Sequence, residues 1–183
     1  MQVLWVVRAL GLRAGMTVAD LGAGTGYFSR FLSAAVGPDG TVFALDPEPK
    51  MVEHLRARAE AERTGNVVPV LASLDDARLP AGAVDVILVV DTYHHIDDRL
   101  AYLRRLARVL RRGGRIAIVD WEKRDLPVGP PMDHKLAREQ VITEMQSAGY
   151  ELRDAPAVLP YQYVLIFAPR LGARPTQPVP ASP

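Results

Sequence analysis

The 183-residue chain contains no cysteine, and aromatic residues make up only 7% of it. The absence of cysteine excludes a disulfide framework, a cysteine-ligated zinc site and a cysteine nucleophile. Lys and Arg total 22 against 21 Asp and Glu, so the net charge gives no general reason to expect nucleic acid as a partner. No apolar run reaches the roughly 20 residues that a membrane helix requires.

The opening stretch, MQVLWVVRALGLRAG, is the part of the chain that most resembles a targeting segment. Arg8 and Arg13 interrupt its apolar run instead of preceding it, which argues against a signal peptide. Hydrophobic residues make up 49% of the chain, enough for the core of one domain. We therefore expect a soluble, cytoplasmic domain over residues 1–168 with no membrane partner. A proline-rich flexible tail is expected at residues 169–183.

Short β-branched apolar runs alternate with helical patterns along most of the chain. Strands are expected at residues 17–21, 41–45, 67–71, 84–90, 115–119, 150–153 and 161–168, and helices at about 27–36, 49–63, 97–111 and 135–148. The helix at 97–111 is expected to end in arginines before Gly113 and Gly114. This alternation predicts an α/β fold with a parallel, Rossmann-like sheet and helices on both faces. The connection between the last two strands is too short for a parallel crossover, so these two should pair antiparallel.

A glycine-rich turn, Asp20-Leu-Gly22-Ala-Gly24-Thr-Gly26, follows the first expected strand. Such a turn lets the backbone approach a ligand closely and directs free N–H groups toward it. The dinucleotide-binding pattern would require a third glycine at position 27, which is Tyr27. The carboxylate before the glycines suits a ligand with an amino group and a positive sulfonium, and it would repel a pyrophosphate.

The segment VADLGAGTGYFSRFL resembles motif I of the class I S-adenosylmethionine-dependent methyltransferases. The resemblance continues in order through Asp46, LDDARLP, VDVILVVDTYHHI and LRRGGRIAIVDW, and covers about residues 10–168. The HHI and LRRGGR elements resemble the small-molecule branch that includes the ubiquinone/menaquinone and arsenite enzymes. The resemblance implies a seven-stranded mixed sheet closed by an antiparallel strand pair, S-adenosyl-L-methionine as cofactor, and a small-molecule methyl acceptor.

The same resemblance assigns the glycine-rich turn to the methionine end of the cofactor. Gly22, Gly24 and Gly26 would pass beneath it, and Asp20 would interact with its amino group, directly or through water. An empty strand–helix turn is the alternative interpretation of this segment.

Two further aspartates are implied at the nucleoside end of the cofactor. Asp46 would bind the ribose hydroxyls, a role that we favour over the alternative of an N-cap for the following helix; the two roles are compatible. An acid after the third strand would meet the adenine amino group. The loop is about two residues longer than the common pattern, so Asp75 and Asp76 are both candidates, and we assign Asp76.

Methyl transfer from a sulfonium depends mainly on holding the nucleophile in line, and it needs a base only when the acceptor must lose a proton. The candidates at the end of the fourth strand are Asp91, Tyr93, His94 and His95. Since neighbouring residues of an extended chain point to opposite faces, we predict His94 in the pocket as base. Asp91 is the second catalytic candidate, and His95 should be buried toward the next helix.

The absence of several sequence features limits the class of methyl acceptor that we expect. No [DNS]-P-P-[YF] element follows the fourth strand, and the arginines of LRRLARVLRRGGR have helical spacing, so a nucleic-acid acceptor is not expected. No third oxygen ligand accompanies Asp91 and Asp120, so no metal site is predicted. The lack of cysteine disfavours a multi-thiol arsenite mechanism.

Only 16 residues precede the first expected strand, room for one helix. The acceptor side is then open, closed by a partner subunit as in a homodimer, or covered by residues 121–134. The alternative function is a non-catalytic, cofactor-binding regulatory or partner subunit that keeps the fold.

Overall fold

The computed structural model describes residues 2–73 and 75–170, so nearly all of the predicted tail lies outside the described residues. The strands are β1 (Thr17–Leu21), β2 (Thr41–Asp46), β3 (Val67–Leu71), β4 (Val84–Val90), β5 (Leu110–Trp121), β6 (Tyr150–Asp154) and β7 (Gln162–Pro169). The helices are α1 (Gln2–Ala9), α2 (Ser29–Val36), α3 (Pro49–Glu62), α4 (Arg99–Val109) and α5 (Arg138–Ser147), with short 3-10 turns η1 (Tyr93–His95) and η2 (Met132–His134). Within the described ranges, no helix has the length and apolar character needed to cross a membrane.

The strands form one seven-stranded sheet in the order β3-β2-β1-β4-β5-β7-β6. β1 to β5 pair in parallel, and β7 pairs antiparallel with both β5 and β6. The predicted α/β class, the mixed sheet and the terminal antiparallel pair are therefore confirmed.

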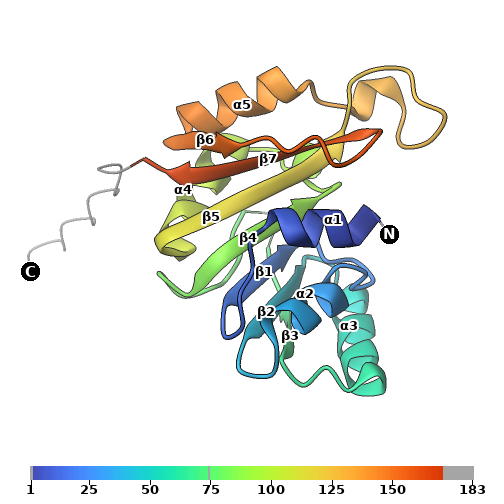
Figure 1. The fold of residues 1–183 in the computed structure, drawn as a ribbon, viewed down its shortest axis with the longest axis vertical. Helices are drawn as coiled ribbons and strands as arrows, with labels where there is room; N and C mark the ends of the chain where they lie inside the picture. Colours follow the sequence, from blue (N-terminus) through green and yellow to red (C-terminus); the bar gives the residue numbers. More distant parts are fainter. Residues whose placement is uncertain (1, 74, 171–183) are drawn as a thin grey trace, which may run out of the picture.

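Helices cover both faces of this sheet (Figure 1). Val6 of α1 and Leu32 of α2 belong to one buried cluster, and Leu106 of α4 belongs to a second on the opposite face. Ile87 and Leu88 are neighbours in β4, yet each lies in a different cluster. A strand buried on both sides needs apolar residues at every position, which is why the central strands read as continuous apolar runs.

The boundary between α4 and β5 differs from the expected one. The helix ends at Val109, and Leu110 already pairs with Val84 before the register shifts and Arg115 pairs with Val86. Leu110 is buried, so it joins the core as a strand residue instead of extending the helix. Arg111, expected at the helix end, instead forms an ion pair of 2.8 Å with Asp85.

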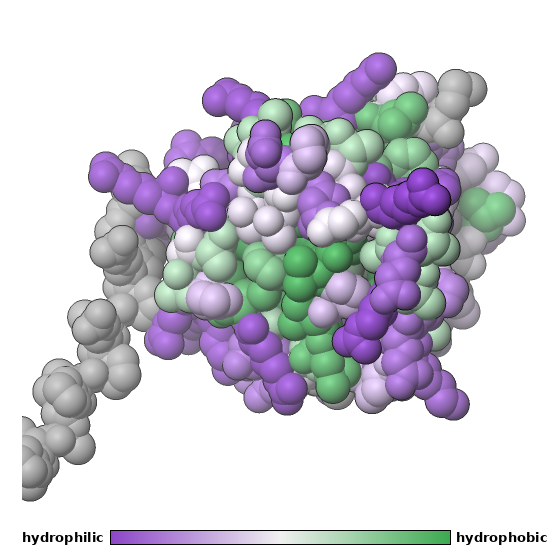
Figure 2. Space-filling model, turned by 90° about the horizontal axis from the view of Figure 1, so that it is seen from below, coloured by the Kyte–Doolittle hydropathy of each residue, from purple (hydrophilic) through white to green (hydrophobic). Residues whose placement is uncertain are grey.

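The edge strand β3 is less covered than the rest of the sheet. Val68 and Leu71 are each 40% exposed, and Figure 2, seen from the β3 side, shows apolar surface near the centre of this face. Pro69 lies in the middle of the strand and has no N–H to offer. A proline at this position opposes the addition of a further strand at the exposed edge.

Candidate cofactor and acceptor site

Four neighbouring parallel strands carry an aspartate within one residue of their carboxyl ends: Asp46 on β2, Asp20 on β1, Asp91 after β4 and Asp120 on β5. Because β2, β1, β4 and β5 are adjacent in the sheet, these carboxylates lie in a row at the carboxyl ends of the parallel strands. Those carboxyl ends form one edge of the sheet. Asp20, Asp46 and Asp120 are buried. This edge, where open α/β sheets bind their ligands, is therefore rich in negative charge.

The glycine-rich turn lies over this edge, and its glycines are required by the backbone. Gly22, Gly24 and Gly26 have φ of 75°, 52° and 75°, in the left-handed region that favours glycine. A Cβ on Gly22 would lie 2.3 Å from Thr92 Oγ1, and one on Gly26 would lie 2.8 Å from Leu55 Cδ2. No atom comes within 4 Å of a Cβ built on Gly24, so space is open at this point of the loop.

Asp46 secures the turn from β2. Its Oδ2 accepts a hydrogen bond of 2.9 Å from Gly24 N, and its Oδ1 accepts one of 3.0 Å from Glu48 N, just before α3. The bond to Glu48 N closes the turn before α3, but the N-cap residue of α3 is Glu48 and the helix has no side-chain capping bond. The capping interpretation of Asp46 is therefore wrong. A carboxylate oxygen can accept a second hydrogen bond, so the ribose role stays a compatible prediction.

Asp20 is 2% exposed, and its Oδ2 accepts a hydrogen bond of 2.6 Å from Ser29 Oγ. Burial raises the pKa of Asp20 to about 6, with a further rise from the Asp46 charge that the Ser29 hydroxyl opposes. A cationic group at this position would favour the ionised carboxylate. This environment fits the amino group of the expected cofactor.

Asp76 is exposed, and its Oδ1 accepts a hydrogen bond of 2.9 Å from Arg78 N within the same loop. Its neighbour Asp75 accepts a bond of 2.7 Å from Ser73 Oγ, which lowers the pKa of Asp75. Both hydrogen bonds join residues within the same loop. The adenine assignment of Asp76 therefore stays a prediction.

The chain turns sharply after β4, which changes the expected placement of the histidines. Asp91 has φ of 50°, and residues Tyr93–His95 form the 3-10 turn η1. Because the segment is not extended, the alternation that placed the two histidines on opposite faces does not apply. The prediction that His95 is buried is wrong, since His95 is exposed.

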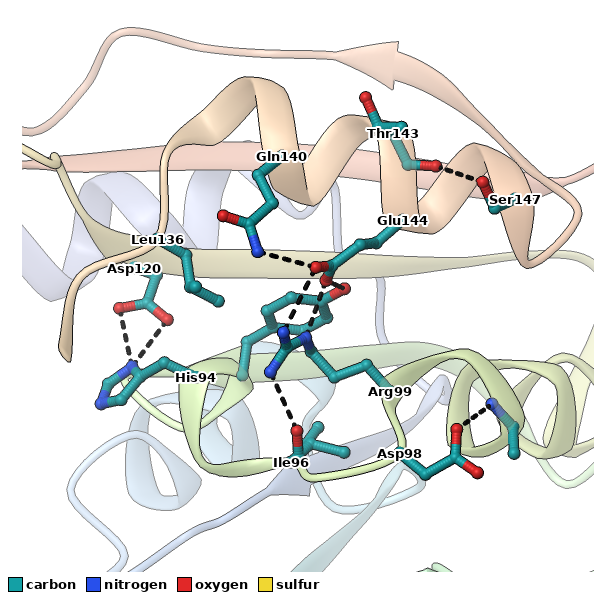
Figure 3. A network of polar contacts seen from close by, with 12 residues as sticks. His94, Ile96, Asp98, Arg99, Asp120, Leu136, Gln140, Thr143, Glu144 and Ser147 are labelled. Atoms are coloured by element: carbon teal, nitrogen blue, oxygen red, sulfur yellow. Dashed lines mark hydrogen bonds and ion pairs between the residues drawn. The ribbon is translucent and has the colours of Figure 1, made fainter. Parts of the chain in front are cut away.

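His94 pairs with a buried carboxylate, as Figure 3 shows. Its side chain is 8% exposed, and its Nδ1 lies 2.9 Å from Asp120 Oδ2 and 3.1 Å from Oδ1. Asp120 also accepts a hydrogen bond of 2.8 Å from Trp121 N, which orients the carboxylate. When Nδ1–H donates to Asp120, Nε2 of His94 is the ring atom left to accept a proton. The sequence placed Asp120 near the site without indicating this pairing.

Tyr93, another candidate, has a different role. Its hydroxyl donates to Glu144 Oε2 at 2.8 Å. Arg99 Nε donates to the same oxygen at 2.7 Å, and Figure 3 shows this pair. Burial, followed by the Glu144 hydrogen bond, raises the pKa of Tyr93 well above its usual range. The network ties the η1 segment to α5 and so fixes the backbone that carries His94.

Asp91 lies beside a pocket of about 350 Å³ between α1, the start of α2 and the ends of β4 and β5. Its Oδ1 accepts a hydrogen bond of 2.7 Å from Gln162 Nε2. Burial raises the pKa of Asp91 to about 6, and the Asp120 charge adds to this rise. The other lining residues are Gln2, Val3, Val6, Tyr27, Phe28, Val90, Val119 and Leu159. Most of these lining residues are apolar and none is basic, and the polar side chains are those of Asp91, Gln162, Gln2 and Tyr27. His94, which we predicted in the pocket, is not among the lining residues.

Among the described residues, no three His, Asp or Glu side chains are grouped so that they could hold a metal ion. The groups described at the carboxyl ends of these strands are carboxylates, one carboxylate-paired imidazole and the backbone of the glycine-rich turn.

Comparison with known proteins identifies the family. A family model described as "Methyltransferase domain" matches residues 18–114, which include the glycine-rich turn, Asp46, Asp91 and His94. The chain belongs to this methyltransferase family. The match supports S-adenosylmethionine as the cofactor, and the open glycine-rich turn beside Asp20 and Asp46 fits its amino and ribose groups.

Two named relatives agree with this family. The demethylmenaquinone methyltransferase of Lactococcus lactis is 29% identical over 128 residues, which cover 68% of this chain and 51% of the relative. The 27-O-demethylrifamycin SV methyltransferase of Amycolatopsis mediterranei is 34% identical over 131 residues, which cover 71% and 47%. The chain therefore spans about half the length of the curated relatives that it matches.

Solved structures of similar fold include a SAM-dependent methyltransferase from Aquifex aeolicus. It is 29% identical, with a TM-score of 0.87 over 90% of this chain and 88% of that one. The [4+2]-cyclase SpnF matches with a TM-score of 0.79 at 14% identity, over 93% of this chain and 80% of that one, a likeness in fold alone.

Proposed function

We propose that the protein transfers the methyl group of S-adenosylmethionine to an uncharged small molecule by in-line displacement. The observation that carries this proposal is the His94–Asp120 pair at the same sheet edge as the glycine-rich turn. Family membership supplies the cofactor, and the buried imidazole–carboxylate pair supplies a base on the acceptor side.

The carboxylates of the edge account for cofactor binding. S-adenosylmethionine, when bound, supplies a methyl group on a positive sulfonium. Asp20 would hold the amino group, and Asp46 the ribose hydroxyls. Asp76 remains the proposed adenine contact. A row of carboxylates favours a cationic ligand, because each buried negative charge lacks the solvation that it would have in water.

On the acceptor side, His94 Nε2 would take the proton of an acceptor hydroxyl. Asp120 holds the imidazole through Nδ1 and stabilises the positive ring that forms when Nε2 is protonated. Asp91 and Gln162 would orient polar atoms of the acceptor. Deprotonation by a positioned side chain contributes about 10²- to 10⁴-fold to rate.

The residues that line the pocket beside Asp91 support a proposal for the acceptor class. Apolar walls without a basic side chain suit an uncharged, largely apolar molecule and disfavour nucleic acid, whose phosphates need cationic partners. Two relatives, the demethylmenaquinone enzyme and the 2-methyl-6-phytyl-1,4-hydroquinone methyltransferase of Synechocystis, are named for quinone or hydroquinone compounds. We therefore propose an aromatic acceptor with a hydroxyl group.

The test is formation of S-adenosylhomocysteine from S-adenosylmethionine with a panel of hydroxylated aromatic compounds. We expect turnover by the wild-type protein and strong loss in His94→Ala. Cofactor binding without turnover on any member of the panel would instead favour the non-catalytic regulatory or partner subunit.

A further inference from the structure

The glycine-rich turn is held in place by contacts to the β2–α3 unit. Three of its N–H groups donate to acceptors at the end of β2: Gly22 and Ala23 to the Leu45 carbonyl, both at 2.9 Å, and Gly24 to Asp46 Oδ2, at 2.9 Å. Gly26 lies against Leu55 of α3. Thr25 lies between these contacts, and its backbone carbonyl accepts a hydrogen bond from a long side chain of α3.

That side chain is Arg58 of α3. Its Nη1 donates to the Thr25 carbonyl at 2.7 Å, across 33 residues of sequence. Its Nε donates to Glu62 Oε1 at 2.8 Å, one helical turn further along. The Arg58 side chain is 24% exposed and that of Glu62 is 34% exposed, and neither residue belongs to the two buried apolar clusters.

The Thr25 carbonyl belongs to the peptide that links Thr25 to Gly26, within the glycine-rich turn. Without a partner this peptide would be free to rotate, and the turn would lose part of the fixed shape that it presents to a ligand. A guanidinium hydrogen bond removes this freedom, because bonds to charged donors are stronger than neutral ones. Glu62 limits the rotamers of Arg58 and reduces the entropy lost when the bond forms.

We propose that Arg58, oriented by Glu62, is a positioning residue that presets the glycine-rich turn for the cofactor. This inference rests on the proposed S-adenosylmethionine site. It predicts an effect on cofactor affinity, and little effect on the chemical step once cofactor is saturating.

The experiment compares Arg58→Gln, Arg58→Lys and Glu62→Gln with wild type by calorimetric titration with S-adenosylhomocysteine. Arg56→Gln is the matched control, because Arg56 is exposed on the same helix and makes no hydrogen bond to the described residues. We expect Arg58→Gln to raise Kd about 5- to 20-fold, on the scale of one charge-assisted hydrogen bond. Arg58→Lys, which keeps a donor but not the paired geometry, should fall between Arg58→Gln and wild type.

A second readout separates positioning from general damage. Steady-state kinetics should show a raised KM for S-adenosylmethionine in Arg58→Gln, with kcat within about twofold of wild type. If Arg58→Gln does not fold, Arg58→Lys and Glu62→Gln carry the test. Affinities within twofold of wild type in the folded variants would overturn the inference. Failure of the wild-type protein to bind S-adenosylhomocysteine would instead overturn the proposed function.

Discussion

Replacement of Asp20 by asparagine should make the ligand-free protein less sensitive to pH. Asp20 is 2% exposed, and burial raises its pKa from 3.8 to about 6. The rise of about two units corresponds to roughly 3 kcal/mol, at 1.36 kcal/mol per unit. This is the approximate free energy by which the buried, ionised Asp20 side chain destabilises the folded protein above pH 6.

The direction of the effect follows from proton binding. Between about pH 4 and pH 6 the folded protein holds the Asp20 proton and the unfolded chain has released it, so the folded state binds more protons. Stability therefore falls as pH rises through this window, and is level above it. The asparagine side chain has no such proton, while its oxygen can still accept the Ser29 hydroxyl. The Asp20 part of the fall, roughly 2–3 kcal/mol between pH 4 and pH 7.5, should vanish in Asp20→Asn.

Urea unfolding of wild type and Asp20→Asn at pH 4 and pH 7.5 measures this difference. For each protein we take the difference between the free energies of unfolding at the two pH values, which removes any pH-independent cost of burying the asparagine amide. Asp133→Asn serves as control, because Asp133 is exposed. The same pH difference in wild type and Asp20→Asn would refute the reasoning. Calorimetry should also show weaker S-adenosylmethionine binding by Asp20→Asn, since the charge that faces the amino group is gone.

The remaining predictions concern the acceptor side and the turn. His94→Ala should lower turnover by about 10²- to 10⁴-fold with cofactor affinity within about threefold, and added imidazole should restore part of the rate. Asp120→Asn should lower kcat with little change in KM for cofactor, because it disturbs the ring that takes the proton. His95→Ala should change the free energy of unfolding by less than about 0.5 kcal/mol, as expected for an exposed side chain; a loss above 1 kcal/mol would contradict its exposure. Gly26→Ala should weaken S-adenosylhomocysteine binding and lower Tm, because it combines a positive φ with a contact of 2.8 Å to Leu55; unchanged binding would show that the turn tolerates a Cβ.

Patterns that depend on neighbouring residues in the chain were sufficient to predict the architecture. The strands read as apolar runs because both faces of each central strand are buried, and the short link before β7 required antiparallel pairing. The spacing of Gly22, Gly24 and Gly26 indicated a turn that approaches a ligand, because left-handed backbone conformations favour glycine.

Contacts between residues distant in the sequence were decided by the tertiary structure alone. His94 meets Asp120 because β4 and β5 are adjacent and η1 turns the chain after β4, and neither the turn nor the facing of the two side chains is visible in local sequence. Arg58 reaches Thr25 for the same reason, since α3 packs beside a turn 33 residues away. Leu110 left the expected helix because its burial against the sheet outweighs local helix propensity, which is worth less than about 1 kcal/mol per residue. Local sequence therefore determined which elements form and where the cofactor turn lies, while packing determined which side chains meet at the acceptor side.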